Sequence, residues 1–351
     1  MSRLTILSVA YPLAPVRPDT AGGAEQILLQ LDHALVRRGH ASLVIAREDS
    51  RVAGTLIPTP AISSPFDAAA RTAAQTLHRA AVERACRQYE IDLVHMHGLD
   101  FDAYLPYADL PVLATLHLPL DRYAGAALTP ARPRTWFNCV SDAQARTAPN
   151  CDAFLPAIEN GVDVDAFAPS RRKAGFALFL GRICAEKGVH LAIEAARRAD
   201  IPLLIAGEVF PYEEHTRYFH QEIEPRLGRA CRYIGRVGVR QKRRLLALAR
   251  CVLIPSLADE TSSLVARESL AAGTPAIAFA RGALREVIDH GRTGFLVDSV
   301  EEMARRIVHA DRIDAEFCRA EARRRFPLNA MTARYLQFYR KLTQPPMRAA
   351  G

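Results

Sequence analysis

The stretch CVLIPSLADETSSLVARESLAAGTPAIAFA, residues 251–280, contains a complete strand–helix–strand unit. CVLIPS and PAIAFA are short apolar runs typical of buried strands, and LVARESLAA between them has the apolar spacing of a helix. Gly273 and Pro275 follow the helical segment and predict its end. A strand, a helix and a second strand in this order indicate a parallel α/β sheet.

The same alternation occurs twice along the chain. A first series of strand-like and helical segments lies at residues 4–9, 24–38, 42–46, 67–89, 92–97, 111–117 and 135–140. A second series lies at residues 176–181, 188–199, 202–207, 212–227, 231–235, 239–249, 251–256, 264–272 and 275–280. Segment 159–175, rich in Gly, Pro, Asp and Arg, separates the two series and reads as a linker. We therefore predict two Rossmann-like, doubly wound domains, residues 1–165 and 166–325, which face a central cleft, and a C-terminal helix within 326–345.

Composition restricts the class of protein. With 351 residues and 49% hydrophobic residues, the chain is long enough for two domains with separate cores. No apolar run reaches the roughly 18 residues that cross a bilayer. The seven cysteines are scattered without CxxC spacing, which suits a reducing cytoplasm, so we expect a cytoplasmic location.

Charge is distributed unevenly between the two halves. Residues 1–165 contain 14 Arg and Lys against 18 Asp and Glu, a net charge of −4. The whole chain has 46 Arg and Lys and 38 Asp and Glu, so the remaining residues contain 32 against 20, a net charge of +12. Anionic ligands should prefer the second half. The arginines lie mostly on predicted helices without interleaved aromatic residues, so no nucleic-acid partner is indicated. Peripheral membrane contact is not indicated either, because the first half is net acidic.

Two glutamates flank the junction between loop and helix in the opening stretch. Glu260 lies in the loop after the strand, and Glu268 lies in the helix, whose side chains lean back toward its N-terminus. Thr261, Ser262 and Ser263 are suited to cap that helix, and its unpaired N–H groups form an anion site. The pattern predicts a ligand with a diphosphate between hydroxyl-rich groups. The alternative is two ordinary surface acids.

Further phosphate-binding candidates follow the first strand of each series. GRICAEKG, residues 181–188, places Arg182 and Lys187 at a strand's carboxyl end, where two cations can hold a diphosphate. TAGGAEQ, residues 20–26, allows Gly22 and Gly23 to bring backbone close to a phosphate. The GxGxxG pattern is absent there, which counts against a dinucleotide-dependent dehydrogenase.

Several polar residues of the first half allow other interpretations. Asp100 and Asp102 form an Asp-x-Asp pattern that could hold a metal, but they lie where a helix begins and are better explained by capping. His95 and His97 share a strand face and lack a third metal ligand, so a structural role is favoured. His117 by itself would be interpreted as a packed core histidine, but it lies at a strand's carboxyl end, where it would face the cleft.

Six segments resemble one known family. GGAE, NGVD, GRICAEKG, the Glu pair that runs into ESLAAGTP, EVIDHGRTGFLV and FPLNAMTARYLQFY are similar to segments of the retaining nucleotide-sugar glycosyltransferases of family 4. The likeness covers the whole chain. It implies the GT-B fold, with the final helix crossing back onto the first domain. One departure is that the family commonly has Gly-Phe-Gly after the first glutamate, where Thr261, Ser262 and Ser263 stand here.

The resemblance also implies roles for the second half. Glu260 would contact the transferred sugar and Glu268 the ribose hydroxyls. Arg182 and Lys187 would bind the diphosphate, and Val237 would line the base. The backbone of Ser262, Ser263 and Leu264 would assist in binding the phosphates.

Fewer roles are implied for the first half. Gly22 and Gly23 would help to bind the diphosphate, His117 would lie near the transferred sugar, and Tyr11 would face the acceptor. The implied partners are a nucleotide-sugar donor and a hydroxyl acceptor, which could be a polysaccharide, a lipid-linked sugar or a natural product. No cofactor and no metal are expected, because Arg182, Lys187 and a helix N-terminus can neutralise the departing diphosphate.

Rival functions have similar architectures. A periplasmic-type sugar-binding protein is also doubly wound twice over, but the phosphate-binding cations and the lack of a convincing signal peptide argue against it. A GT-B epimerase or phosphorylase is a nearer alternative. The donor base, the sugar and the acceptor are left open by the sequence.

Overall fold

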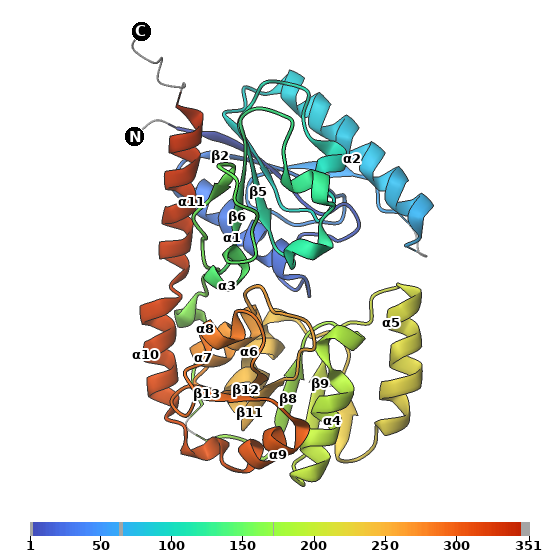
Figure 1. Cartoon of the computed structure of the whole chain (residues 1–351), viewed down its shortest axis with the longest axis vertical. Coiled ribbons are helices and arrows are strands. Elements are labelled where there is room, and N and C mark those ends of the chain that lie inside the picture. The colour runs from blue at the N-terminus through green and yellow to red at the C-terminus, as the bar shows by residue number, and fades with distance from the viewer. Residues whose placement is uncertain (1–2, 63–65, 171, 345–351) are drawn as a thin grey trace. The chain divides into compact units, whose positions relative to one another are not determined.

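The protein folds into two compact units in the computed structural model, which describes residues 3–62, 66–170 and 172–344 (Figure 1). Unit 1 contains Met1–Val140, Ala145–Ile158 and Asn329–Gly351, and unit 2 contains Ser141–Gln144 and Glu159–Leu328. The chain therefore leaves unit 1 and returns to it at its C-terminal end. No helix within the described residues is long and apolar enough to span a membrane.

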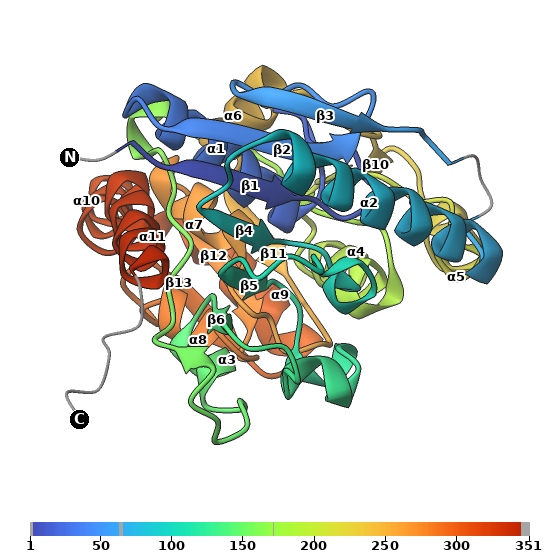
Figure 2. The ribbon, with the colours of Figure 1, turned by 90° about the horizontal axis from the view of Figure 1, so that it is seen from above.

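Unit 1 is built on a parallel sheet of seven strands in the order β3-β2-β1-β4-β5-β6-β7, part of which can be followed in Figure 2. Its strands are β1 (Thr5–Val9), β2 (Ala41–Arg47), β3 (Thr55–Thr59), β4 (Leu93–Met96), β5 (Val112–Leu116), β6 (Thr135–Cys139) and β7 (Phe154–Leu155). Successive strands are added on one side of β1 up to β3 and on its other side from β4 onward, so the strand order reverses between β1 and β4. Such a switch point is where open α/β sheets bind ligands, at the strands' carboxyl ends.

Helices cover both faces of the unit 1 sheet. Alternate residues of β2 point to opposite faces: Leu43 and Ile45 pack in one cluster with α2 (Ala68–Gln88), and Val44 packs in another with α1 (Gly23–Arg37). The helix α11 (Leu328–Thr343) covers β4 to β6 through Tyr335 and Tyr339, which are fully buried.

The aromatic stripe of the C-terminal segment divides between the two units. Met331, Tyr335 and Tyr339 are buried on α11, and Phe338 is half-buried. Phe326 belongs to the core of unit 2 instead, because it precedes the crossing point at Leu328. Residue 345, the last of the predicted C-terminal segment, lies outside the described residues.

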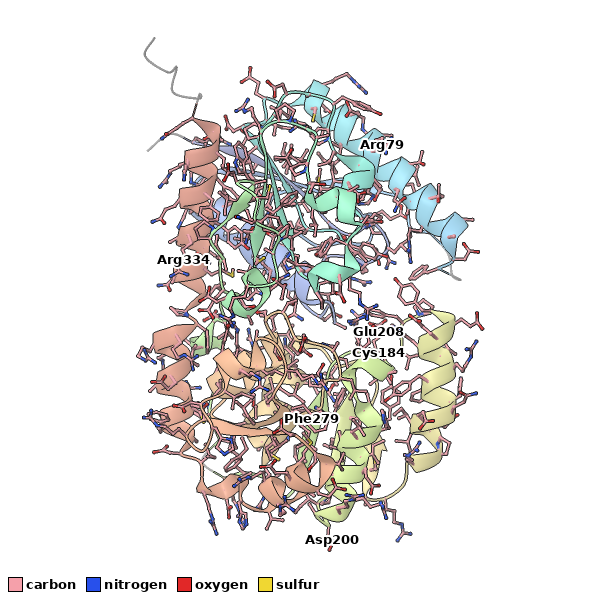
Figure 3. The ribbon with its side chains drawn as sticks, viewed as in Figure 1. Arg79, Cys184, Asp200, Glu208, Phe279 and Arg334 are labelled. Atoms are coloured by element: carbon pink, nitrogen blue, oxygen red, sulfur yellow. The ribbon has the colours of Figure 1, made fainter. Side chains whose placement is uncertain are left out.

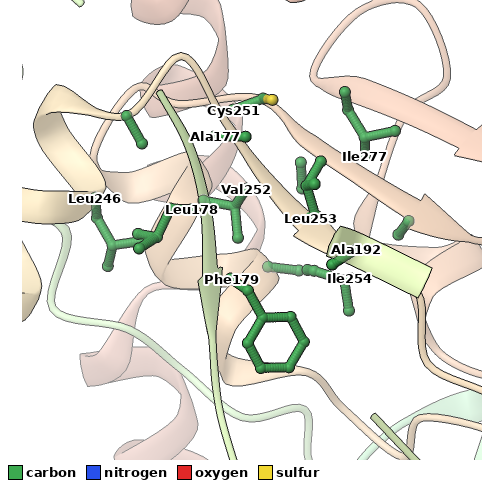
Figure 4. Close-up of a cluster of buried hydrophobic side chains, with 14 of the residues drawn as sticks. Ala177, Leu178, Phe179, Ala192, Leu246, Cys251, Val252, Leu253, Ile254 and Ile277 are labelled. Carbon is green, nitrogen blue, oxygen red and sulfur yellow. The ribbon is translucent and has the colours of Figure 1, made fainter. Parts of the chain in front are cut away.

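Unit 2 contains a second parallel sheet, in the order β10-β9-β8-β11-β12-β13. Its strands are β8 (Ala177–Leu180), β9 (Leu203–Ala206), β10 (Cys231–Tyr233), β11 (Cys251–Ile254), β12 (Ala276–Phe279) and β13 (Gly294–Val297). Its helices are α4 (Val189–Arg198), α5 (Glu213–Tyr218), α6 (Val239–Leu248), α7 (Leu264–Ala271), α8 (Leu284–Val287), α9 (Val300–Val308) and α10 (Ala315–Arg325). Apolar side chains of β8 and β11 form the centre of its core with Ala192 and Leu246 (Figure 4). Here the switch point lies between β8 and β11.

The predicted parallel α/β architecture is confirmed, with differences in particular elements. Segment 212–227 was expected to be one helix, but α5 ends at Tyr218 and is followed by a π turn and a 3₁₀ turn that contains Pro225. Proline cannot donate the helical hydrogen bond, which explains the break. β3 was not predicted, because TLIPT contains Pro58, and such a strand is tolerated at the edge of a sheet.

Candidate active site

Two loops of unit 2 meet at the carboxyl ends of β8 and β11, which are neighbouring parallel strands. The loop after β8 contains Arg182 and Lys187, and the loop after β11 contains Glu260. The N–H of Leu257 donates to the carbonyl of Glu186 at 2.8 Å, and so does the hydroxyl of Ser256 at 3.3 Å. The two loops therefore form one structure at the sheet's switch point.

Two glycines permit this close packing. Gly188 has a φ of +66°, and a Cβ at this position would lie 2.0 Å from the carbonyl oxygen of Pro255. Gly282 has a φ of +50°, and its Cβ would lie 2.4 Å from the carbonyl oxygen of Glu260. That same oxygen accepts a hydrogen bond from Ala283 at 2.7 Å. Only glycine fits both the dihedral angles and the contacts.

Lys187 and Glu260 form an ion pair within these loops. Their Nζ and Oε1 atoms are 2.6 Å apart, and the Glu260 side chain is 9% exposed. Burial would raise the pKa of Glu260, but the charge and hydrogen bond of Lys187, with Ser256 and Arg182, lower it below its usual value. Glu260 is therefore a carboxylate at neutral pH. Arg182 contacts Glu186 more loosely, at 3.8 Å.

Glu268 forms a second ion pair, with Lys242. The Nζ of Lys242 lies 2.5 Å from Oε1 of Glu268, and the two side chains are 16% and 10% exposed. Lys242 lies on α6 and Glu268 on α7. The sequence did not single out Lys242, because α6 contains four basic residues and only its packing against α7 selects this one.

The beginning of α7 differs from the predicted capping. Ser263 occupies the N-cap position with a φ of 53°, and its hydroxyl makes no capping hydrogen bond. The Ser262 hydroxyl is buried and has no hydrogen-bond partner among the described residues. Leu264 is the first residue of α7, and Val237 lies half-buried in the loop before α6. The capping prediction was therefore wrong for the two serines, and at Ser263 the left-handed backbone departs from the extended conformation usual for an N-cap.

Arg267 stabilises the loop before α7 through a hydrogen bond to its backbone. It is fully buried, its Nε donates to the Ser262 carbonyl at 3.3 Å, and it also donates to the Asn160 carbonyl. Its guanidinium stacks 4.3 Å from the ring centroid of Phe326 and lies 3.4 Å from Glu159. Burial lowers the pKa of Arg267 to about 10, so it remains charged at neutral pH. Sequence reasoning missed this residue, because the sequence does not distinguish a buried arginine of a helix from a solvent-exposed one.

Unit 1 holds the other predicted residues. Gly22 is the N-cap of α1 and Gly23 its first residue; a Cβ on Gly22 would lie 1.8 Å from Oε2 of Glu25. Glu25 is therefore folded back against the glycine turn. Tyr11 is half-buried in the loop between β1 and α1.

His117 follows β5, is half-buried, and lies beside two buried histidines, His97 and His95. Its Nε2 is 3.0 Å from Nδ1 of His97, and the His97 ring lies 4.0 Å from that of His95, centroid to centroid. Burial lowers the pKa of His117 to about 3, and burial and the neighbouring imidazoles lower the pKa of His95 and His97. All three are neutral at physiological pH.

The Asp-x-Asp pattern has a different structural role from either interpretation. Asp100 accepts hydrogen bonds from the Tyr104 hydroxyl at 2.9 Å and the Gln75 amide at 2.7 Å, and it makes no capping bond. Burial raises the pKa of Asp100, and these hydrogen bonds oppose the shift. Asp102 is exposed. No group of three or more potential metal ligands occurs among the described residues.

The structure thus places one set of predicted residues within unit 2, in the loops after β8, β10 and β11 and on α7, and an ion pair joins Lys187 to Glu260. That set comprises Arg182, Lys187, Val237, Glu260, Ser262, Ser263, Leu264 and Glu268. Gly22, Gly23 and His117 lie in unit 1, at loops that follow β1 and β5.

Comparisons with known proteins cover most of the chain. The family model described as Glycosyltransferase Family 4 matches residues 21–166, and the model described as Glycosyl transferases group 1 matches residues 165–324. The phosphatidyl-myo-inositol mannosyltransferase of Mycobacterium leprae (strain TN) is 26% identical over 369 residues, covering 93% of this chain and 95% of its own.

Solved structures share the fold over nearly the whole length. Sucrose-phosphate synthase from Thermosynechococcus elongatus has a TM-score of 0.78 at 20% identity, covering 97% of this chain and 99% of that chain. Anabaena Alr3699/HepE in complex with UDP-glucose has a TM-score of 0.73 at 18% identity, covering 97% and 100%. With two adjoining family matches over residues 21–324 and this fold, the chain belongs to the family 4 glycosyltransferases of the GT-B type.

Proposed function

We propose that this glycosyltransferase moves a sugar from a nucleoside diphosphate to a hydroxyl acceptor, retains the anomeric configuration and requires no divalent metal. The observation that carries the proposal is that both glutamates of the segment after β11 form ion pairs, Glu260 with Lys187 in the loops and Glu268 with Lys242 between α6 and α7. Two little-exposed carboxylates beside cations suit a ligand that is anionic in the middle and rich in hydroxyls at both ends.

The ion pairs suggest how the donor binds. The diphosphate attracts Lys187 and Arg182, and Lys187 thereby leaves Glu260. The freed carboxylate accepts hydrogen bonds from hydroxyls of the transferred sugar. Glu268, held by Lys242, accepts from the ribose hydroxyls. A nucleoside-diphosphate sugar of this kind, UDP-glucose, is bound in the complex of Anabaena Alr3699/HepE, a protein of the same fold.

The reaction is a front-face substitution. The bond from the anomeric carbon to the phosphate oxygen breaks, and a bond to the acceptor oxygen forms on the same face. The acceptor's proton passes to the departing diphosphate, so no side chain serves as a covalent nucleophile. Arg182 and Lys187 supply two positive charges, and the N-terminus of α7 adds roughly half a charge, which neutralises the leaving group as a metal would.

Product NMR and rate measurements test retention of configuration, metal independence and the role of Lys187. NMR of the first-formed product should show the donor's anomeric configuration, with nearly the same rate in excess EDTA as with added Mg²⁺. Lys187→Ala should lower turnover at least about a hundredfold. An inverted product would refute retention, and activity lost in EDTA and restored by Mn²⁺ would refute metal independence.

For the acceptor we propose only a chemical class, a hydroxyl compound. A polysaccharide, a lipid-linked sugar and a natural product remain the candidate acceptors. We propose a cytoplasmic location on the basis of the cysteines, all seven of which are free thiols.

A further inference from the structure

Unit 1 contains a pocket at the opposite end of its strands from the loops that hold Gly22, Gly23 and His117. Its volume is about 440 Å³, and it is lined by Arg3, Arg38, Gly39, His40, Ala333, Leu336, Gln337 and Arg340. Arg3 precedes β1 and His40 precedes β2, so the pocket lies at the amino ends of these strands. Gly22, Gly23 and His117 follow strands, and therefore belong to the opposite edge.

All titratable side chains that line the pocket are basic. Three arginines and a histidine line the pocket, and no carboxylate does. Residues 3–18, 33–47 and 328–343, which supply the walls, contain no Asp or Glu at all. Like charges gathered this way repel one another, and an anion would relieve the repulsion.

The acids next to these wall segments are engaged elsewhere. Asp32 accepts hydrogen bonds from the Ser42 hydroxyl at 2.7 Å and from the N–H of Ala53 at 2.5 Å. Asp92 accepts from the N–H of Thr5 at 2.7 Å. The final carbonyls of α1 are also satisfied, since His40 N–H donates to the Leu35 carbonyl at 3.0 Å.

His40 reports the positive field in the pocket. Its side chain is buried, and its Nδ1 accepts from the N–H of Leu4 at 3.0 Å. Burial, followed by the charges of Arg340 and Arg38, lowers the pKa of His40. Arg38 is fixed in place by a hydrogen bond to the Thr332 hydroxyl of α11 at 3.2 Å.

The position of α11 changes the charge of the unit. Residues 1–165 are net acidic, but unit 1 includes Asn329–Gly351 and excludes residues 141–144 and 159–165. It contains 18 Arg and Lys against 14 Asp and Glu, a net +4. The acidic balance of the first half, which disfavoured anionic partners, therefore does not describe the folded unit.

We propose that this pocket is a second anion site, which binds a phosphate group carried by a small molecule or by a lipid headgroup. Guanidinium groups bind phosphate with paired hydrogen bonds, and three arginines line this pocket. The volume lies within the roughly 300–1,000 Å³ of small-ligand sites. Leu336 and Ala333 supply an apolar wall for the part of the ligand attached to the phosphate.

The test follows His40 by NMR while inorganic phosphate is added to the full chain. Saturation should raise the pKa of His40 by about one unit, because the anion offsets the two arginine charges. Arg340→Gln and Arg3→Gln should each weaken this response at least about tenfold. Arg334→Gln is the matched control. Arg334 is an exposed residue of α11 outside the pocket (Figure 3), and its substitution by Gln removes the same charge.

The two sources of phosphate are separated by further titrations. Glycerol phosphate and vesicles of phosphatidylcholine, with or without anionic phosphatidylglycerol, replace inorganic phosphate. A His40 response to the soluble ester alone identifies a free ligand, and a response to anionic vesicles that Arg340→Gln removes identifies a headgroup. The proposal is overturned if His40 does not respond to any phosphate, or if the response is the same in Arg340→Gln and Arg334→Gln.

Discussion

Glu260 and Glu268 differ in whether their ion pairs can persist when the donor binds. Lys187, the partner of Glu260, should also bind the diphosphate, so this ion pair must break when the donor binds. Glu268 is held by Lys242 from a neighbouring helix, and this pair does not have to break. Two glutamates in similar ion pairs should therefore respond differently to substitution.

Glu260→Gln should lower turnover about ten- to a hundredfold, because a charged hydrogen bond to the sugar is lost. Affinity for the free nucleoside diphosphate should remain within about threefold or rise, since Lys187 no longer has a competing carboxylate. Steady-state kinetics and calorimetry measure the two effects. Glu194→Gln, an acid of α4 paired with Arg198, is the control and should change neither. Wild-type turnover in Glu260→Gln would contradict the sugar-side role.

At the scale of elements, packing between segments positions these side chains. The loop after β8 carries Lys187, and Gly188 lets it lie directly against the loop after β11. In unit 1, α11 is attached to the sheet by hydrogen bonds of Tyr335 and Tyr339 as well as by apolar contact. Both arrangements can be tested with single substitutions.

Gly188→Ala should lower the free energy of unfolding of unit 2 by more than about 2 kcal/mol, through the positive φ and the contact with Pro255. Hydrogen exchange at the amides of β8 and β11 measures the loss. The matched substitution is Gly228→Ala, where a Cβ meets no atom within 4 Å. Equal protection in both variants would show that the loops do not need this contact.

Tyr339→Phe should destabilise unit 1 by about 1 to 3 kcal/mol, the cost of an unpaired buried acceptor. Thr115 donates its hydroxyl hydrogen to Asn138, so His95 Nε2–H donates to Thr115 and its Nδ1 accepts from Tyr339. Urea unfolding followed by the fluorescence of the single tryptophan, Trp136 in β6, reports this unit. Tyr107→Phe, at a residue 78% exposed, should have no effect. A similarly small effect in Tyr339→Phe would refute the proposed hydrogen-bond directions.

At the scale of the whole molecule, the sequence was most informative where a pattern repeats. Alternating strands and helices predicted both parallel sheets, and the spacing of Glu260 and Glu268 directed attention to one strand edge. Lys242 and Arg267 could not be found this way, because their partners are brought close by the tertiary fold and lie 26 and 108 residues away in the chain. The capping serines were misassigned because a positive φ at Ser263 is not visible in a sequence.

Buried neutral histidines should make unit 1 sensitive to acid. The pKa of His117 is lowered to about 3 and those of His95 and His97 lie below their ordinary value of 6.5, so the unfolded chain binds more protons below pH 6.5. Stability is unaffected above pH 7 and falls as pH drops through 6.5, by about 1.4 kcal/mol per pH unit for each histidine.

Urea unfolding monitored by Trp136 between pH 7 and 5.5 measures this dependence. The three histidines together contribute a slope approaching about 4 kcal/mol per pH unit at the acid end. His78, whose pKa is lowered by burial to about 4, and His40 lie in the same unit and add to this slope. His117→Gln should reduce the slope by about 1.4 kcal/mol per pH unit, whatever its effect on stability at pH 7. A free energy of unfolding that is constant over this range would mean that the histidines are not buried as neutral groups.

The most direct test of the central claim is calorimetry of a nucleoside diphosphate with the full chain in excess EDTA. Wild-type protein should bind UDP or GDP without metal. Glu268→Ala should bind the same nucleotide at least about tenfold more weakly, because a charged hydrogen bond to ribose is worth about 1.5 to 3 kcal/mol. Glu194→Ala should bind as the wild type does. Absence of binding by the wild type in EDTA, or equal affinity in Glu268→Ala and Glu194→Ala, would contradict the assignment of this edge of unit 2 as the donor site.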